Sequence, residues 1–187
     1  MRGLVLAFEG FADLPPAWRD CRTIDAFGKV TFPLDVVRAF VGDAPVAITI
    51  HHQLLDILDF EPPGAPYDLC FIRHPDPWGE PRSWLCAIAA IGECLRGELT
   101  CVFHRQHEGL AFNFLLAAML GAENAKFLSA EKVEDAGGER HIALRWQINA
   151  KGVQRDMGIR FRNRLRAILR QFYTQIGQFH RNLDYFR

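Results

Sequence analysis

Side chains that can do chemistry gather directly after one apolar run of this sequence. The run Tyr67–Ile72 is followed by His74, Asp76 and Trp78, with a proline on each side of the aspartate. Imidazole and carboxylate groups can transfer protons, and an indole ring can stack on a planar ligand. An aspartate between prolines is also a frequent turn former, and Trp78 and Trp84 could equally be packing residues. Both alternatives stay open at this point.

Other polar segments stand in the same kind of place, at the end of an apolar run. They are Glu9–Phe11, Asp25, His51–His52 and His104–Glu108. The last of these could hold a phosphate at a helix N-terminus or form a solvated loop.

The histidines raise the question of a metal site. His51 and His52 are adjacent, so an extended chain points them to opposite faces and they chelate poorly. His74, His104 and His107 could be added to such a site. We expect no metal, because the adjacent pair makes a poor chelate.

These segments have to be positioned by strands and helices that alternate along the chain. Apolar runs predict strands, and apolar residues three or four apart predict helices. The predicted strands are Gly3–Phe8, Cys21–Phe27, Pro45–Ile50, Tyr67–Ile72, Leu99–His104, Ala125–Leu128 and Ile142–Ile148. The predicted helices are Pro33–Val41, a helix capped by Ser83 that runs to about Leu95 and stops before Gly97, Glu108–Leu120, and Arg160–Arg181.

This alternation indicates the α/β class, with a Rossmann-like, doubly wound, mainly parallel sheet and helices on both faces. We expect Leu4–Phe8, Val46–Ile50, Phe71–Ile72 and Leu99–Phe103 to be its central, buried strands. Ligands of such sheets bind beyond the carboxyl ends of the strands, which is where the polar segments stand.

The block from about residue 45 to 105 resembles class I S-adenosylmethionine-dependent methyltransferases. The resemblance rests on Asp59 with Phe60, on Tyr67-Asp68 opening an apolar strand, and on the turn from Leu95 to Glu98. It implies that Asp59 and Phe60 lie near the adenine of the cofactor. It also implies that His74, Asp76 and Trp78, on the loop after that strand, face the substrate.

Pro75-Asp76-Pro77-Trp78 is also similar to the FPDPW motif of tRNA guanine-N7 methyltransferases, with His74 in place of the phenylalanine. The glycine-rich loop that the superfamily has after its first strand is reduced here to Gly10, preceded by Glu9. The resemblance implies that Glu9, Gly10 and Asp25 hold the cofactor, with Asp25 on its ribose.

Composition and cysteine usage place the chain among ordinary globular proteins. Its 187 residues are 49% hydrophobic, and we expect residues 1–187 to form a single Rossmann-like domain. The five cysteines include no CxxC pair, which predicts reduced thiols and a cytoplasmic protein. The apolar N-terminal run is too short to span a membrane, and we expect no membrane partner.

The charge is divided unevenly along the chain. Residues 151–187 hold nine basic and two acidic side chains, so the tail carries +7 and the remainder −7. Arg162, Arg166 and Arg170 recur at four-residue spacing on the predicted C-terminal helix. They could bind a nucleic acid or an acidic protein, or they could be a solvated helix face.

Two functions from different classes remain at this stage. The first is a divergent S-adenosylmethionine-dependent methyltransferase that acts on RNA or a small molecule. The second is a non-catalytic binding or assembly module that uses the basic C-terminal helix on the same fold. The reduced glycine loop favours the second function, and the block around Tyr67–Trp78 favours the first.

Overall fold

The structure is a computed structural model that describes residues 1–6, 18, 20–27, 47–51, 66–134, 138–149 and 159–184. The strands are β1 (Arg2–Leu6), β2 (Thr23–Phe27), β3 (Ala47–His51), β4 (Tyr67–Arg73), β5 (Leu95–Phe103), β6 (Ala125–Glu134) and β7 (Arg140–Ile148). The helices are α2 (Pro81–Cys94), α3 (Gln106–Leu120) and α4 (Ile159–Asp184). The predicted helix Pro33–Val41 lies outside the described residues.

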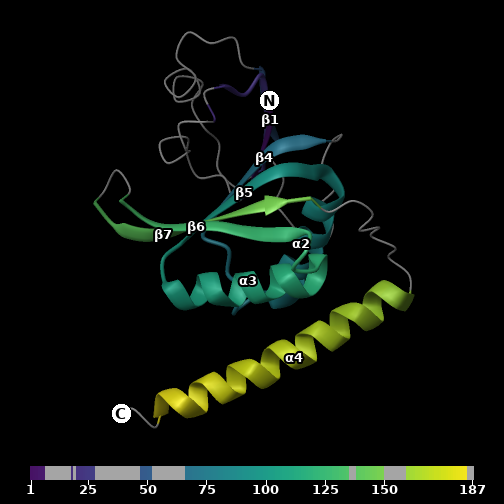
Figure 1. Ribbon diagram of the computed structural model, residues 1–187, viewed down its shortest axis with the longest axis vertical. Helices are drawn as coiled ribbons and strands as arrows, with labels where there is room; N and C mark the ends of the chain where they lie inside the picture. The colour runs from purple at the N-terminus through teal and green to yellow at the C-terminus, as the bar shows by residue number, and fades with distance from the viewer. Residues whose placement is uncertain are drawn as a thin grey trace.

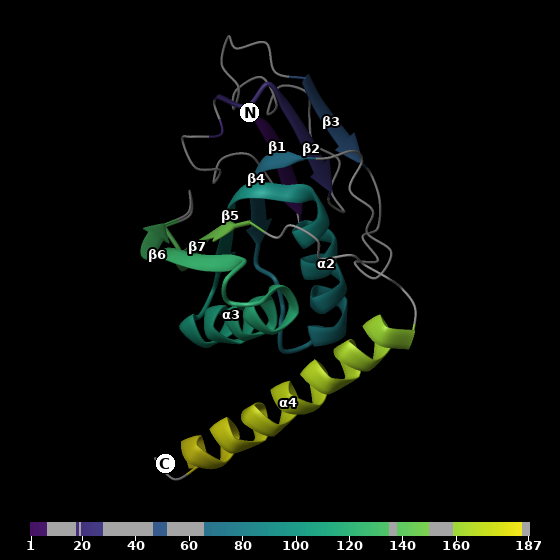
Figure 2. The same ribbon diagram turned by 45° about the vertical axis from the view of Figure 1, so that its right-hand side comes forward.

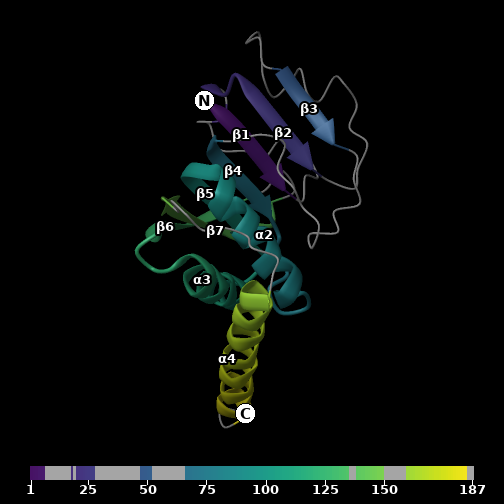
Figure 3. The ribbon, with the colours of Figure 1, turned by 90° about the vertical axis from the view of Figure 1, so that its right-hand side faces the viewer.

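The strands form one seven-stranded sheet in the order β3-β2-β1-β4-β5-β7-β6. The strands from β1 to β5 are paired in parallel, and β7 is antiparallel to both β5 and β6. The predicted mainly parallel sheet is therefore confirmed. The chain order reverses at β1, which pairs with both β2 and β4 (Figure 3).

Two helices cover one face of this sheet, and a third helix lies outside them. Figure 1 shows α2 and α3 beside the sheet and α4 running obliquely beyond them, and Figure 2 shows the same order from another side. The core between sheet and helices contains the fully buried Tyr67, Phe103, Phe112 and Trp146. A second, smaller apolar cluster, which includes Val5, Trp18, Phe71 and Val102, lies on the opposite face of the strands.

Helix α4 agrees closely with the helix predicted over Arg160–Arg181. Phe161, Leu165, Ile168 and Phe172 form a buried stripe that joins the core, because residues three and four apart share one helix face. Tyr173 falls off this stripe and is 56% exposed, so it is a surface residue.

Helix α2 ends at Cys94, within one residue of the predicted end, but Gly97 does not follow it as a turn. Strand β5 begins at Leu95 and continues through the glycine. A Cβ atom on Gly97 would collide with the carbonyl oxygen of Asp68 on β4. The β4–β5 register shifts at the same place. Glycine therefore permits a close approach of two backbones and does not end the strand.

Two further expectations need correction. Helix α2 begins at Pro81 after the N-cap residue Glu80, so Ser83 lies inside the helix and does not cap it. Strand β3 forms one edge of the sheet, so the prediction of a central strand over Val46–Ile50 is wrong.

All five cysteines are free and buried. Burial raises the pKa of the Cys21 thiol to about 11 and that of Cys94 to about 12. Burial also raises the pKa values of Cys70 and Cys101 well above the usual range of a thiol. Because a raised pKa favours the neutral thiol, these groups carry almost no thiolate near neutral pH.

We therefore predict that the native protein resists alkylation. Iodoacetamide at about pH 8 should leave the folded chain unmodified, because the reagent attacks exposed thiolate. The same reagent should label all five cysteines in denaturant, as counted by intact mass. Rapid labelling of one cysteine in the native protein would contradict this packing.

Candidate functional site

The residues from His74 to Trp78 leave the sheet at the carboxyl end of β4. The backbone N–H of His74 donates to the carbonyl of Val102 at 2.8 Å, so this residue is held against β5. His74 has φ +47°, a left-handed conformation that few residues other than glycine adopt. The following proline restricts its backbone further. The direction in which the Cβ atom of His74 leaves the chain is therefore set by the local backbone.

Asp76 builds the turn that leads into α2. Its Oδ1 atom accepts hydrogen bonds from the backbone N–H groups of Trp78 at 3.1 Å and Gly79 at 2.7 Å. Its own carbonyl accepts from the N–H of Glu80 at 3.1 Å. These bonds are those of an aspartate-stabilised turn, which fits the turn-forming alternative left open by the sequence.

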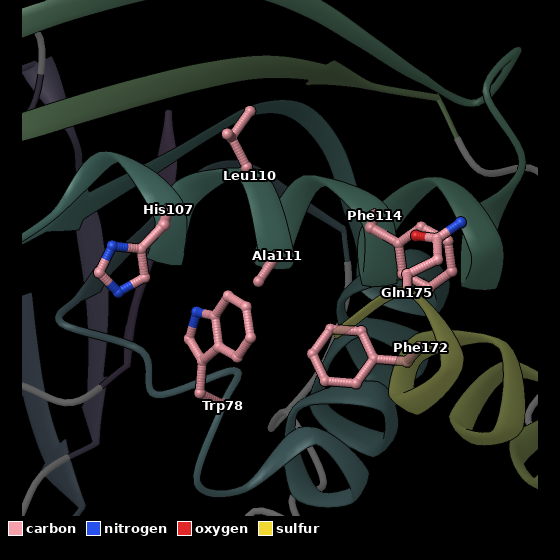
Figure 4. Close-up of a pocket in the computed structure, with 7 residues that line it drawn as sticks. All are labelled: Trp78, His107, Leu110, Ala111, Phe114, Phe172 and Gln175. Carbon is pink, nitrogen blue, oxygen red and sulfur yellow. The ribbon is translucent and has the colours of Figure 1, made fainter. Parts of the chain in front are cut away.

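Trp78 lines an apolar pocket of about 170 Å³ between the β4–α2 loop, α3 and α4. Its ring contacts His107 edge-on at 5.6 Å and Phe172 at 6.0 Å between centroids. Figure 4 shows the indole between the His107 and Phe172 side chains. The other lining residues are Leu110, Ala111, Phe114 and Gln175. The pocket therefore has aromatic walls at the end of β4.

His74 also belongs to a cluster of three histidines with His104 and His141, which we call the histidine cluster. One nitrogen from each ring lies within 4.8 Å of the others. His104 follows β5, and His141 is the second residue of β7 and is 3% exposed. His107, which the sequence offered as a possible third ligand, faces the Trp78 pocket instead.

The sequence alone did not single out His141. It precedes the predicted strand Ile142–Ile148 by one residue. Only the antiparallel pairing of β7 with β5, in which Ile142 faces Phe103, brings His141 beside His104. The alternation of apolar residues along β7 predicts a strand, but it does not predict how that strand pairs with β5.

Asp25 lies in the middle of β2, in register with Leu4 of β1. Its carboxylate accepts hydrogen bonds from the Arg2 guanidinium and from the Tyr67 hydroxyl, both at 2.9 Å. Arg2 and Tyr67 are the first residues of β1 and β4. The Asp25 carboxylate therefore contacts residues at the amino ends of β1 and β4. Its predicted contact with the ribose of the cofactor stays a prediction.

Burial raises the pKa of Tyr67 well above the usual value of a phenol, and the hydrogen bond to Asp25 adds to the effect. The Tyr67 hydroxyl is thus a neutral donor at every physiological pH.

The other predicted cofactor residues, Glu9, Gly10, Asp59 and Phe60, lie outside the described residues. On α4, Arg162, Arg166 and Arg170 are all exposed, as a binding surface or a solvated face requires. Arg164 differs from them because its guanidinium donates to the carbonyl of Met119 at 2.6 Å, near the end of α3.

The fold can now be compared with known proteins. No family model and no curated protein sequence matches this sequence. Solved methyltransferase structures match the fold. The N-methyltransferase NodS from Bradyrhizobium japonicum WM9 is 13% identical, with a TM-score of 0.57 over 79% of this chain and 85% of that one.

The fold of this chain is similar to that of these solved methyltransferases. The magnesium protoporphyrin IX methyltransferase ChlM from Synechocystis PCC 6803, solved with bound S-adenosylmethionine, has a TM-score of 0.54 at 10% identity. The match covers 79% of this chain and 69% of that one. The 16S rRNA methylase RmtB has a TM-score of 0.51 at 20% identity, over 79% of this chain and 56% of that one.

These identities are low, so the likeness concerns the fold. It agrees with the family resemblance inferred from the block around Tyr67–Trp78. Among the described helices, none combines the length and the apolar character needed to cross a membrane.

We predict that Asp25 and Arg2 stabilise the fold as a coupled pair. Replacing Asp25 by Asn, or Arg2 by Gln, should each lower the free energy of unfolding by about 1–3 kcal/mol, the scale of a hydrogen bond to a charged group. In denaturant melts, the double variant should lose less free energy of unfolding than the sum of the losses in the two single variants. Strictly additive losses would contradict the coupling.

The same variants test the ribose assignment of Asp25. If Asp25 holds the cofactor, Asp25→Asn should weaken S-adenosylmethionine binding while Arg2→Gln does not. If the carboxylate only joins the strands, both variants should bind with native affinity once folded.

Proposed function

We propose that this chain is a methyltransferase that uses S-adenosylmethionine. The observation that carries the proposal is the sheet order, which reverses at β1 beside β4 and includes the antiparallel β7. Ligands of doubly wound sheets bind at such a reversal, beyond the carboxyl ends of the strands. The chain emerging from β4 there carries His74, Asp76 and Trp78.

The cofactor would lie over the carboxyl end of β1, where Glu9 and Gly10 follow the strand in sequence. Asp59 and Phe60 are proposed for its adenine. When bound, S-adenosylmethionine supplies an electrophilic methyl group. The protein's task is then to align a nucleophile and exclude water, because methyl transfer depends mainly on orientation.

The substrate would present a single planar ring to the Trp78 pocket. A cavity of about 150 Å³ accommodates benzene, so the 170 Å³ found here suits one six-membered ring. Its aromatic walls favour edge-to-face and stacked contacts with such a ring.

The proposed substrate-facing residues would then have different tasks. Trp78 forms a wall of the pocket, Asp76 holds the loop in shape, and His74 stands at the end of β4. We further propose that residues 1–187 form one domain and that the protein acts in the cytoplasm.

We predict that the purified protein binds S-adenosylmethionine and S-adenosylhomocysteine in a calorimetric titration, with one ligand per chain. It should also release S-adenosylhomocysteine when supplied with a panel of phenols, indoles and nucleosides. No heat of binding at millimolar cofactor would refute the proposal.

A variant that fills the pocket tests the proposed substrate site separately from the proposed cofactor site. Ala111→Phe places a ring in the pocket, so it should abolish turnover and leave cofactor binding unchanged. Tyr173→Ala, at an exposed position of α4 that does not line the pocket, is the matched control and should retain both activities. Native turnover in Ala111→Phe would place the substrate elsewhere.

A second candidate function is a binding module that uses α4. It is favoured by the exposure of Arg162, Arg166 and Arg170 along one flank of a helix whose opposite stripe is anchored in the core. The three like charges repel each other by a few tenths of a kcal/mol per pair, and an anionic partner would relieve this repulsion.

We predict that, if this partner is RNA, its affinity falls steeply with salt because each neutralised phosphate releases counterions. Replacing the three arginines together by Gln should reduce the salt slope by about three, and Arg160→Gln by at most about one. The melting temperature should stay native in both. Loss of stability with no RNA binding at low salt would assign these arginines to internal pairing.

A further inference from the structure

We propose that the histidine cluster, His74, His104 and His141, is a binding site for a divalent transition metal of the zinc type. This site goes beyond the proposed methyl transfer and does not depend on it.

The fold brings the three histidines together from three neighbouring strands. His74 follows β4, His104 follows β5 and His141 is the second residue of β7, and these strands are adjacent in the sheet. The parallel β4–β5 register pairs Arg73 with Val102, and the antiparallel β5–β7 register pairs Phe103 with Ile142. His74 follows Arg73, His104 follows Phe103 and, on the antiparallel strand, His141 precedes Ile142. All three histidines therefore lie at the same edge of the sheet.

The histidines come from the face of the sheet opposite to α2 and α3. His141 has the same strand parity as Ala143, which belongs to the second apolar cluster. His104 has the same parity as Val102, which belongs to it as well. Alternation along a strand therefore directs both imidazoles toward that face. The His74 imidazole lies against both, with ring centroids 3.6 Å from His104 and 4.9 Å from His141.

The distances suit a metal once the stacked rings of His74 and His104 turn their nitrogens toward a common point. The candidate nitrogen atoms lie within 4.8 Å of one another. Two nitrogens on a tetrahedral zinc ion are about 3.3 Å apart, given Zn–N bonds of about 2.0–2.1 Å. The rings of His74 and His104 are stacked with centroids 3.6 Å apart. The His104 side chain is 45% exposed, so it has room to turn its edge toward the other two rings.

The donor set selects the class of metal. Three neutral imidazoles suit zinc, copper, nickel or cobalt, whereas magnesium and calcium prefer oxygen ligands. Within the described residues, no cysteine or carboxylate joins the cluster as a fourth ligand. Three protein ligands leave a fourth position for water or a substrate atom, as in catalytic zinc sites.

A carboxylate stands beside the cluster where an outer-shell group would be expected. The Oε1 atom of Glu139 lies 3.6 Å from Nδ1 of His104. A carboxylate on one imidazole nitrogen fixes the tautomer and leaves the other nitrogen for the metal. At 3.6 Å this contact is longer than a hydrogen bond, so the carboxylate has to approach Nδ1 to fix that tautomer. Nε2 of His104 would then be the ligand atom. With a metal bound, His74 is a ligand and does not transfer protons.

The test is a titration of the chelator-stripped full chain with Zn²⁺ alone, in competition with a chromogenic chelator. We expect one Zn²⁺ per chain at micromolar affinity or tighter, and no competition by Mg²⁺. His104→Asn should weaken binding more than about 100-fold, because loss of a ligand exceeds the roughly 10–100-fold cost of an outer-shell change. Glu139→Gln should fall within that smaller range.

His107→Asn is the matched control, since it removes a nearby histidine that faces the Trp78 pocket, and its zinc affinity should be native. Zinc-edge X-ray absorption of the native protein should show three nitrogen neighbours at about 2.0–2.1 Å. This measurement needs no variant, so it still decides the matter if His104→Asn fails to fold. Absence of stoichiometric zinc, or equal losses in His104→Asn and His107→Asn, would overturn the site.

Discussion

The pairing of β1 with both β2 and β4 is the constraint on which the rest of the structure depends. Leu4 lies in register between Asp25 of β2 and Cys70 of β4, and it is fully buried. Because the sheet is parallel on both sides of β1, the connections from β1 and from β4 depart at the same edge. The loop that carries His74 and Trp78 therefore starts beside the end of β1. A shift of either pairing by one residue would turn the side chains of one strand to the opposite face of the sheet. The loops at this edge would then no longer be held in place.

The other end of the same three strands is held by polar contacts. Asp25 accepts from Arg2 and from Tyr67, so one carboxylate joins β1, β2 and β4 near their amino ends. Arg2 also stacks on the Tyr67 ring at 4.5 Å, and its backbone N–H donates to Asp68 at 2.7 Å. Buried charged groups are stable only when paired and hydrogen-bonded in this way. We infer that these contacts fix the register of β1, β2 and β4. That register in turn positions the loops at the carboxyl ends of the strands.

The sequence predicted the helices and strands better than it predicted which of them lie next to one another in the fold. Continuous apolar runs such as Tyr67–Ile72 indicate buried strands because both faces of a parallel sheet are covered. Gly97 was misread because a glycine that permits backbone contact looks, in sequence, like a glycine that ends a helix. The edge position of β3 and the approach of His141 to His104 both depend on non-local pairing, which no periodicity along the chain encodes. The turn around Asp76 was among the alternatives that the sequence offered, because its hydrogen bonds are local.

The carboxyl edge of the sheet carries two different environments because side chains alternate along each strand. Phe103 points into the core beneath α2 and α3, on the side where the β4–α2 loop brings Trp78 against α3 and α4. His104, the next residue, points to the opposite face and meets His74 and His141. Phe103 and His104 thus face two different environments, the apolar core and the histidine cluster. His107, one turn further along in α3, lines the pocket while His104 belongs to the cluster. A substrate seated against Trp78 and a metal held by the histidines would accordingly lie on different sides of the sheet.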